Sequence, residues 1–278
     1  MGFWIRWIRW AALAAMVSCC AATEPVAPDM VRIAAAGELR VAMTPEDWPP
    51  FFYRHPVRGM AGLDVDLAEE IARRLGVRVR FVREAHTFDE LIAMVEDRRA
   101  DLAISYLSDT LERAERVRFT RAYVQLKPTL LINRGLAGRA RRGRDLGSLL
   151  NHPEAVIGVT KGSSAESFAA EDFPLAQVVG YETWTDITAA VMEEKLLAGL
   201  SDQIDAQNWQ DANPEGVIAI ETVILNNKPD TLAIAVNRED RQLLYWLNHF
   251  LGRKIQDGSL AGLKRHYLEN NSWKKDLQ

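Results

Sequence analysis

The segment from Asp101 to Tyr123, DLAISYLSDTLERAERVRFTRAY, carries residues whose types and spacing could do chemistry. An apolar stretch typical of a buried strand is followed by the hydroxyls of Ser108 and Thr110 and then by Arg113. Open parallel sheets bind ligands beyond the ends of their strands, where a guanidinium can hold a carboxylate through two hydrogen bonds. The pattern therefore indicates a site for a small carboxylate. It also fits a helix cap at Ser108 or Thr110 with Arg113 on the surface.

The apolar spacing around this segment predicts the elements that would position its side chains. Residues 39–43 and 77–81 alternate as strands do, and residues 64–75 and 88–95 place apolar side chains at helical intervals. Residues 102–105 then form a third, buried strand. The order βαβαβ predicts a parallel sheet with right-handed crossovers.

A second series of elements follows in the other half of the chain. Residues 196–200 form an apolar run that we interpret as a strand ending at Ser201 and Asp202, although so short a run also fits a helix. The basic run from Arg139 to Arg144 is expected to be a solvated loop. The other expected elements are strands at 155–160, 178–179 and 232–236 and helices at 162–170, 186–194 and 243–251.

Composition and charge exclude some classes of function. The chain has 278 residues, of which 48% are hydrophobic and 26% charged, and a net charge of -4, which is ordinary for a soluble globular protein. No basic excess favours nucleic acid, so we expect no nucleic-acid partner. The histidines are scattered without metal-ligand spacing, and we expect neither a metal nor a cofactor.

The N-terminus has the features of an export signal. Residues 1–9 contain two arginines and no acid, and residues 10–20 are apolar and far shorter than the ~20 residues that span a membrane; a membrane anchor is the alternative interpretation. The tripeptide before Cys19 resembles a bacterial lipobox. We therefore expect a lipoprotein-type signal peptide at 1–18, acylation at Cys19 or alternatively Cys20, and a tether through residue 30.

Several segments, in this order and spacing, resemble the periplasmic solute-binding proteins of family 3, the substrate-binding proteins of polar amino-acid ABC transporters. They are GELRVAM with WPPFFY, GLDVDLAEEIARRLG, FDELIAMVEDRRADLAIS, SDTLERAERVRFTRAY, VIGVTKGSS and the stretch from LAIAVNRED to DGSLAGLKRHYLE. The resemblance implies the type II periplasmic-binding-protein (Venus flytrap) fold of the α/β class, with two lobes, each around a central, mostly parallel sheet. Two hinge crossovers, near residues 123–127 and 225–231, would join a first lobe (31–124 and 226–278) to a second (125–225).

The same resemblance assigns polar groups to the cleft between the lobes. Arg113 matches the position that pairs with the ligand carboxylate, and Ser108 matches a donor beside it. Ser163 and Ser164 match donors of the second lobe at a helix N-terminus, where free N–H groups and the helix dipole favour an anion. Plain helix capping is the alternative role for these two serines.

Aromatic and acidic positions also follow from the resemblance. Trp48 and Phe88 match residues that sandwich the aliphatic part of the ligand, with ordinary core packing as the alternative. Asp202 matches the carboxylate that meets the ligand's ammonium group, and its alternative role is to cap a helix. The strand before it departs from the family by a leucine in place of an acidic residue. A shifted register would bring Asp205 or Gln207 to the ligand instead.

The resemblance implies a monomeric receptor that binds a small carboxylate, in particular an amino acid, and delivers it to an inner-membrane ABC permease. Such a receptor would touch the membrane only through its lipid anchor and would not be an enzyme.

Two other functions remain open. A sensor or regulatory module is similar to the N-terminal half of lytic transglycosylase F, although few residues follow Tyr267 and we expect no lysozyme-like domain. A cyclohexadienyl dehydratase of this fold would need a carboxylic acid in the cleft to drive loss of water and CO2. The candidates for that acid are Glu46, Asp47 and Asp202.

Overall fold

The structure is a computed structural model that describes residues 27–141, 143–226, 228–270 and 273–274. The expected signal peptide, Cys19, Cys20 and most of the tether lie outside these residues. The described part begins with helix α1 (Pro28–Ala36), whose first position holds a proline, as many helices do. Among the described helices, none has the length and apolar character needed to cross a bilayer.

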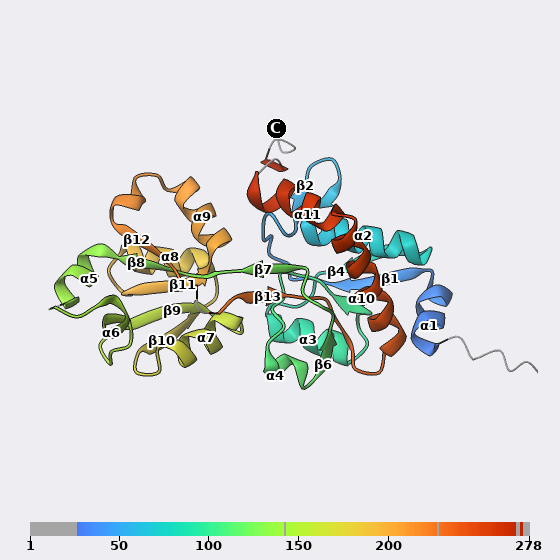
Figure 1. The fold of residues 1–278 in the computed structure, drawn as a ribbon, viewed down its shortest axis with the longest axis horizontal. Coiled ribbons are helices and arrows are strands. Elements are labelled where there is room, and N and C mark those ends of the chain that lie inside the picture. Colours follow the sequence, from blue (N-terminus) through green and yellow to red (C-terminus); the bar gives the residue numbers. More distant parts are fainter. Residues whose placement is uncertain (1–26, 142, 227, 271–272, 275–278) are drawn as a thin grey trace, which may run out of the picture.

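Two five-stranded sheets form two lobes, which lie side by side along the long axis of the molecule (Figure 1). The first sheet has the order β4 (Arg78–Val82), β1 (Glu38–Ala42), β5 (Leu102–Ala103), β14 (Ala235–Asn237) and β6 (Val117–Phe119). Strand β1 is parallel to β4 and to β5, whereas β14 is antiparallel to both of its neighbours. Four of its five strands therefore run the same way.

The second sheet repeats this plan. Its order is β10 (Gln177–Tyr181), β9 (Val156–Thr160), β11 (Ala198–Asp202), β8 (Pro128–Asn133) and β12 (Ile220–Ile224). Strand β8 is the antiparallel member, and all six of its residues are buried. The predicted α/β fold with two mostly parallel sheets is confirmed, and the run at 196–200 belongs to a strand.

Helices cover both sheets. Helix α2 (Leu63–Leu75) shows how the sequence sets their ends: its apolar face is buried, two arginines lie in its last turn, and Gly76 ends it with a φ of 72° that favours glycine. The other helices of the first lobe are α1, α3 (Phe88–Glu96), α4 (Leu111–Ala114), α10 (Arg241–Gln256) and α11 (Ser259–Lys264). This lobe also contains the π-helical turn Arg265–Glu269 and a hairpin formed by β2 (Tyr53–His55) and β3 (Gly59–Ala61). The second contains α5 (Arg134–Arg141), α6 (Leu146–Leu150), α7 (Ser164–Asp172), α8 (Trp184–Met192), α9 (Gln203–Ala212) and the 3-10 turn Gly216–Ile218.

Two short strands connect the lobes. Strand β7 (Val124–Leu126) leads from the first lobe to the second, and β13 (Asp230–Leu232) leads back. They pair antiparallel, with Leu126 opposite Asp230, and lie between the two sheets (Figure 1). The two predicted hinge crossovers therefore run side by side and form one paired ribbon between the lobes.

Two expectations about local structure were wrong. The single strand expected at 232–236 is two strands, β13 and β14, because the chain leaves the hinge ribbon at Leu232 before it enters the first sheet at Ala235. The basic run at 139–144 is not all loop, since α5 continues to Arg141. Ala137 on the inner face of α5 is buried in the core of the second lobe, and this packing outweighs the run of like charges.

Candidate functional site

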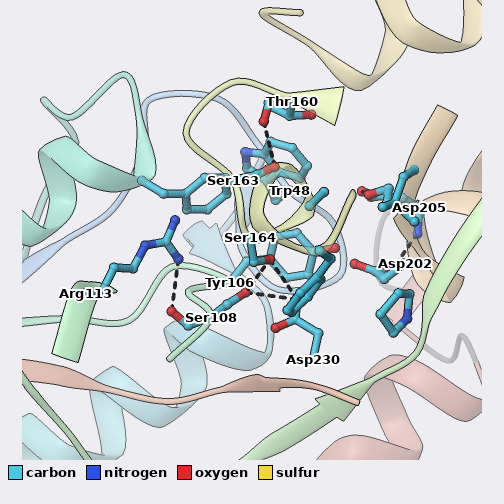
Figure 2. Close-up of a pocket in the computed structure, with 16 residues that line it drawn as sticks. Trp48, Tyr106, Ser108, Arg113, Thr160, Ser163, Ser164, Asp202, Asp205 and Asp230 are labelled. Carbon is cyan, nitrogen blue, oxygen red and sulfur yellow. Dashed lines mark hydrogen bonds between the residues drawn. The ribbon is translucent and has the colours of Figure 1, made fainter. Parts of the chain in front are cut away.

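A small cavity of about 40 Å³ lies between the two lobes. A cavity of that size has room for only a few water molecules, so a larger solute can enter only when the lobes separate. Both lobes and the hinge contribute to its lining (Figure 2). The lining residues are Trp48, Phe88, Tyr106, Ser108, Arg113, Pro128, Thr160, Ser163, Ser164, Ala165, Phe168, Leu200, Ser201, Asp202, Asp205 and Asp230.

Arg113 reaches this cavity from the short helix α4, which Thr110 caps with its side chain. The residue is 6% exposed, so the surface alternative is wrong. One guanidinium nitrogen donates to the carbonyl of Ser108 at 3.0 Å in its own lobe, and another donates to the carbonyl of Gly162 at 2.8 Å in the opposite lobe. The guanidinium also lies 5.6 Å from the ring centre of Phe88. Arg113 therefore joins the two lobes.

Burial lowers the pKa of the Arg113 guanidinium from its ordinary value, and the carboxylates of Asp89 and Asp230 partly offset this effect. An arginine stays protonated in proteins even so. Its positive charge is thus held in a nearly dry place with carboxylates on either side, and two of its five N–H groups are used on backbone carbonyls.

The serines expected at the site come together around an acid that the sequence did not single out. Ser108 of the first lobe and Ser164 of the second lie 3.0 Å apart between their hydroxyl oxygens. Both lie near one carboxylate oxygen of Asp230, at 2.9 Å and 3.1 Å respectively (Figure 2). Ser163 is the N-cap residue before α7 but makes no capping bond with its side chain, and its hydroxyl donates to the carbonyl of Thr160 at 2.6 Å.

Asp202 has both roles considered for it. It is the last residue of β11 and caps α9, because its Oδ1 accepts the backbone N–H groups of Ile204 at 2.7 Å and Asp205 at 3.3 Å. It also lines the cavity together with Asp205, whose carboxylate accepts the hydroxyl of Ser201 at 2.5 Å. Gln207 does not line the cavity and donates to Asp211 on the exposed face of α9.

The three cavity carboxyls have raised pKa values. Burial holds the pKa of Asp202 well above its ordinary value, and the neighbouring charge of Asp205 raises it further. Burial likewise raises the pKa of Asp205 to about 6 and that of Asp230 to about 6, although hydrogen bonds from the nearby serines oppose the shifts. These carboxyls would gain from a nearby cation, because a positive charge offsets the desolvation of their ionised forms.

Aromatic side chains form the wall on the first lobe. Trp48 stacks on Tyr106 with ring centres 5.4 Å apart and lies 6.0 Å from Phe88. Trp48 and Phe88 also pack against the core of the lobe, so the core-packing alternative and the cavity wall are both correct descriptions. Tyr106 has a φ of 54°, which is unusual for a residue other than glycine. The buried carboxylate of Asp64 accepts its backbone N–H at 2.6 Å and holds this turn in place.

The sequence analysis missed several lining residues, chiefly Tyr106 and Asp230. Tyr106 lies inside the segment that carries Ser108 and Arg113, so its position beyond the strand was an available signal. Asp230 lies in the second predicted crossover, and a charged residue there could have been assigned to the space between the lobes. The proposed dehydratase acid Asp47 lies outside the cavity, where bonds from Arg83 and Arg54 lower its pKa. Glu46 does not line the cavity either.

Two α/β lobes, a paired hinge and a small cavity enclosed between them define the class of two-lobed proteins that close around a solute. The model of the bacterial extracellular solute-binding proteins, family 3, matches residues 39–270. Because this match spans most of the chain, the protein belongs to that family.

The chain resembles several proteins of known name. It is 24% identical to the lysine/arginine/ornithine-binding periplasmic protein of Escherichia coli (strain K12) over 262 residues, 92% of this chain and 94% of the relative. It is 29% identical to the cyclohexadienyl dehydratase of Pseudomonas aeruginosa over 184 residues, 66% of each protein and thus just under two thirds of the enzyme. A putative ABC-transporter binding component from Wolinella succinogenes, solved with lysine, has a TM-score of 0.73 at 28% identity and covers 86% of this chain and 99% of its own.

Proposed function

We propose that this protein is an extracytoplasmic receptor that binds a cationic amino acid between its lobes and delivers it to an ABC permease. The observation that carries the proposal is the charge of the enclosed cavity. Three carboxyls, those of Asp202, Asp205 and Asp230, line it together with the single guanidinium of Arg113. The carboxyls outnumber the guanidinium three to one, so their ionised forms would give the cavity an excess of negative charge for a solute to meet.

A cationic solute suits this lining on two independent grounds. Buried carboxylates are stabilised when a positive charge pairs with them. Trp48, Tyr106 and Phe88 also line the cavity, and aromatic rings attract cations electrostatically. Two of the three named relatives agree in chemistry, since one is a lysine/arginine/ornithine-binding protein and another was solved with lysine.

Closure of the lobes would give the receptor its selectivity. Bonds across the cleft join Arg113 to Gly162 and Ser164 to the hinge residue Asp230, and Asn208 donates to the carbonyl of Pro49 at 3.1 Å. A solute that contacts both lobes adds to these bonds only in the closed form and so shifts the population toward it. The permease would then recognise the closed, loaded molecule.

We further propose export through residues 1–18, a lipid anchor at Cys19 and a monomeric receptor.

A thermal-shift panel of cationic, neutral and acidic amino acids tests the binding proposal. A solute at 100 times its Kd adds ~2.7 kcal/mol to the stability of the protein. We expect a shift with arginine, lysine or ornithine, a smaller one with glutamine and none with glutamate. The double variant Asp202→Asn and Asp205→Asn should lose the shift, whereas Glu154→Gln, which removes an exposed charge outside the cleft, should keep it. A shift with glutamate alone would overturn the cationic ligand class.

A dehydratase is a second candidate, because buried carboxyls with raised pKa values can act as acids and one named relative is such an enzyme. Incubation with prephenate at neutral pH separates the two functions. Formation of phenylpyruvate that disappears in Asp202→Asn would establish the enzyme, and unchanged prephenate favours the receptor.

A further inference from the structure

The two hydroxyls that the family resemblance assigns to the ligand carboxylate already have a carboxylate partner within the chain. Ser108 and Ser164 place their hydroxyl oxygens 2.9 Å and 3.1 Å from the same oxygen of Asp230. Ser108 belongs to the first lobe, Ser164 to the second and Asp230 to the hinge strand β13. The three parts of the molecule thus meet at one carboxylate oxygen, as Figure 2 shows.

The position of Asp230 is fixed by its strand. Its backbone pairs with Leu126 in the hinge ribbon, and the next residue, Thr231, donates its hydroxyl to Asp109. Asp230 is 9% exposed and lines the cavity. A carboxylate held this way is a permanent part of the cleft, whichever solute enters.

This arrangement opposes a second carboxylate. A serine hydroxyl has one proton to donate, so a serine that donates to Asp230 has none left for an anion on a solute. Like charges in a buried site also repel strongly. The remaining anion-binding group, Arg113, uses two N–H groups on the carbonyls of Ser108 and Gly162. The two serines expected to hold a ligand carboxylate are therefore engaged within the protein, and Arg113 is engaged through two of its five N–H groups.

The groups that suit a cation are differently placed. Asp202 and Asp205 line the cavity on the side away from Arg113 (Figure 2). The hydrogen bonds that Asp202 accepts from α9 go to Oδ1. The stacked rings of Trp48 and Tyr106 add their faces to the same cavity.

We propose that Asp230 is a specificity-determining residue that takes the place of the ligand carboxylate at Ser108 and Ser164, so that the cleft selects a solute for its positive charge. An amine that lacks the carboxylate should then bind in the cleft as well as the amino acid with the same cationic side chain does. This inference rests on the proposed function, because it names the recognised group of the same cationic solute.

Matched pairs that differ only in the carboxylate test this inference. Arginine is compared with agmatine, and lysine with cadaverine, by isothermal titration calorimetry on the purified protein. We expect each amine to bind with a Kd within tenfold of its amino acid. Asp230→Asn removes the charge, and Asp230→Ala also frees both hydroxyls. In each variant the affinity for the amino acid should increase at least tenfold relative to the affinity for the matching amine. Glu154→Gln should leave the ratio unchanged, since Glu154 is an exposed acid outside the cavity.

The outcomes separate the two proposals. If the amino acids bind and the amines bind more than tenfold more weakly to the unaltered protein, Asp230 does not have this role and the receptor proposal stands. If the ratio of the two Kd values is unchanged in the Asp230 variants, Asp230 likewise does not have this role and the receptor proposal stands. If no cationic compound binds, both proposals fail together. Circular dichroism establishes that each variant is folded, and the ratio in the unaltered protein decides the matter if a variant does not fold.

Discussion

Arg113 of the first lobe donates a hydrogen bond of 2.8 Å to the backbone carbonyl of Gly162 in the second lobe. The same guanidinium donates to the carbonyl of Ser108 at 3.0 Å, so one rigid, planar group is bonded on both sides of the cleft. Gly162 precedes α7, whose N-terminal residues line the cavity. Closure of the lobes and the position of this helix are therefore coupled through Arg113.

Replacing Arg113 should weaken the binding of every solute that the closed lobes enclose. Hydrogen bonds to charged groups contribute about 1.5–3 kcal/mol, so Arg113→Lys, which keeps the charge but loses the planar fork, should weaken binding by roughly tenfold or more. Titration calorimetry with arginine and agmatine measures this effect. The two ligands should lose affinity equally if Arg113 acts through closure. A much larger loss for arginine would show instead that Arg113 holds the ligand carboxylate. Arg139→Lys, on the exposed face of α5, is the control.

Binding of a cationic solute should release protons from the cleft. Burial raises the pKa of Asp205 to about 6. Burial also holds the pKa of Asp202 well above its ordinary value, and the charge of Asp205 raises it further. A bound cation favours the ionised carboxylates, so affinity should rise as pH increases through about 6. Titration at pH 6 in buffers of different ionisation enthalpy measures the proton count directly. Asp205→Asn should reduce the count, and an affinity that stays flat from pH 5 to 8 would contradict the prediction.

Asp64 should make the protein less stable as pH rises. Burial raises its pKa to about 8 in the folded state, although the hydroxyl of Tyr123 donates to it at 2.8 Å. An unfolded aspartate ionises near pH 4. Between about pH 4 and 8 the folded state therefore binds more protons than the unfolded state, and stability falls with a slope of up to ~1.4 kcal/mol per pH unit.

The variant Asp64→Asn isolates this effect, because it removes the ionisable group and keeps the shape of the side chain. Its amide oxygen can accept the backbone N–H of Tyr106, and its NH2 group, in place of the other oxygen, can donate to the hydroxyl of Tyr123. Urea unfolding at pH 5 and at pH 8 should show a smaller decrease in stability for the variant than for the unaltered protein. Equal decreases in both proteins would show that Asp64 is already ionised in the folded state. Asp145→Asn, at an exposed helix cap, is the matched control.

Gly62 should not tolerate a side chain. It has a φ of 130°, and an added Cβ would lie 2.2 Å from the carbonyl oxygen of Phe51. Steric overlap and backbone strain together should make Gly62→Ala less stable by at least ~2 kcal/mol. Chemical unfolding measures the change. Gly138→Ala in α5, where an added Cβ meets no atom within 4 Å, should instead be neutral or gain up to ~1 kcal/mol. A stable Gly62→Ala protein would contradict the structure around Phe51.

The elements of both lobes were readable in the sequence because their packing leaves a periodic apolar pattern. Helix α2 and strand β1 lie within a residue or two of the predicted ranges, since each buries one regular face. Position beyond a strand, together with residue type, made Arg113 a candidate for the site but left a surface position equally open. The family resemblance assigned it to the cleft, and the structure places it in the cavity lining. Local pattern thus determined the elements and named a candidate polar group of the site.

Tertiary structure decided which groups meet. The position of Asp230 in a predicted crossover indicates the space between the lobes, but its partners could not be predicted, because Ser108 and Ser164 lie far away in the sequence and on different lobes. The separation of β13 from β14 likewise depends on pairing with strands distant in sequence, β7 on one side and β5 on the other. Burial, which raises the pKa of Asp230 to about 6, arises among contacts with residues of both lobes. Periodicity records which face of an element is buried, whereas the identity of its neighbours depends on contacts between distant segments, which a local pattern does not contain.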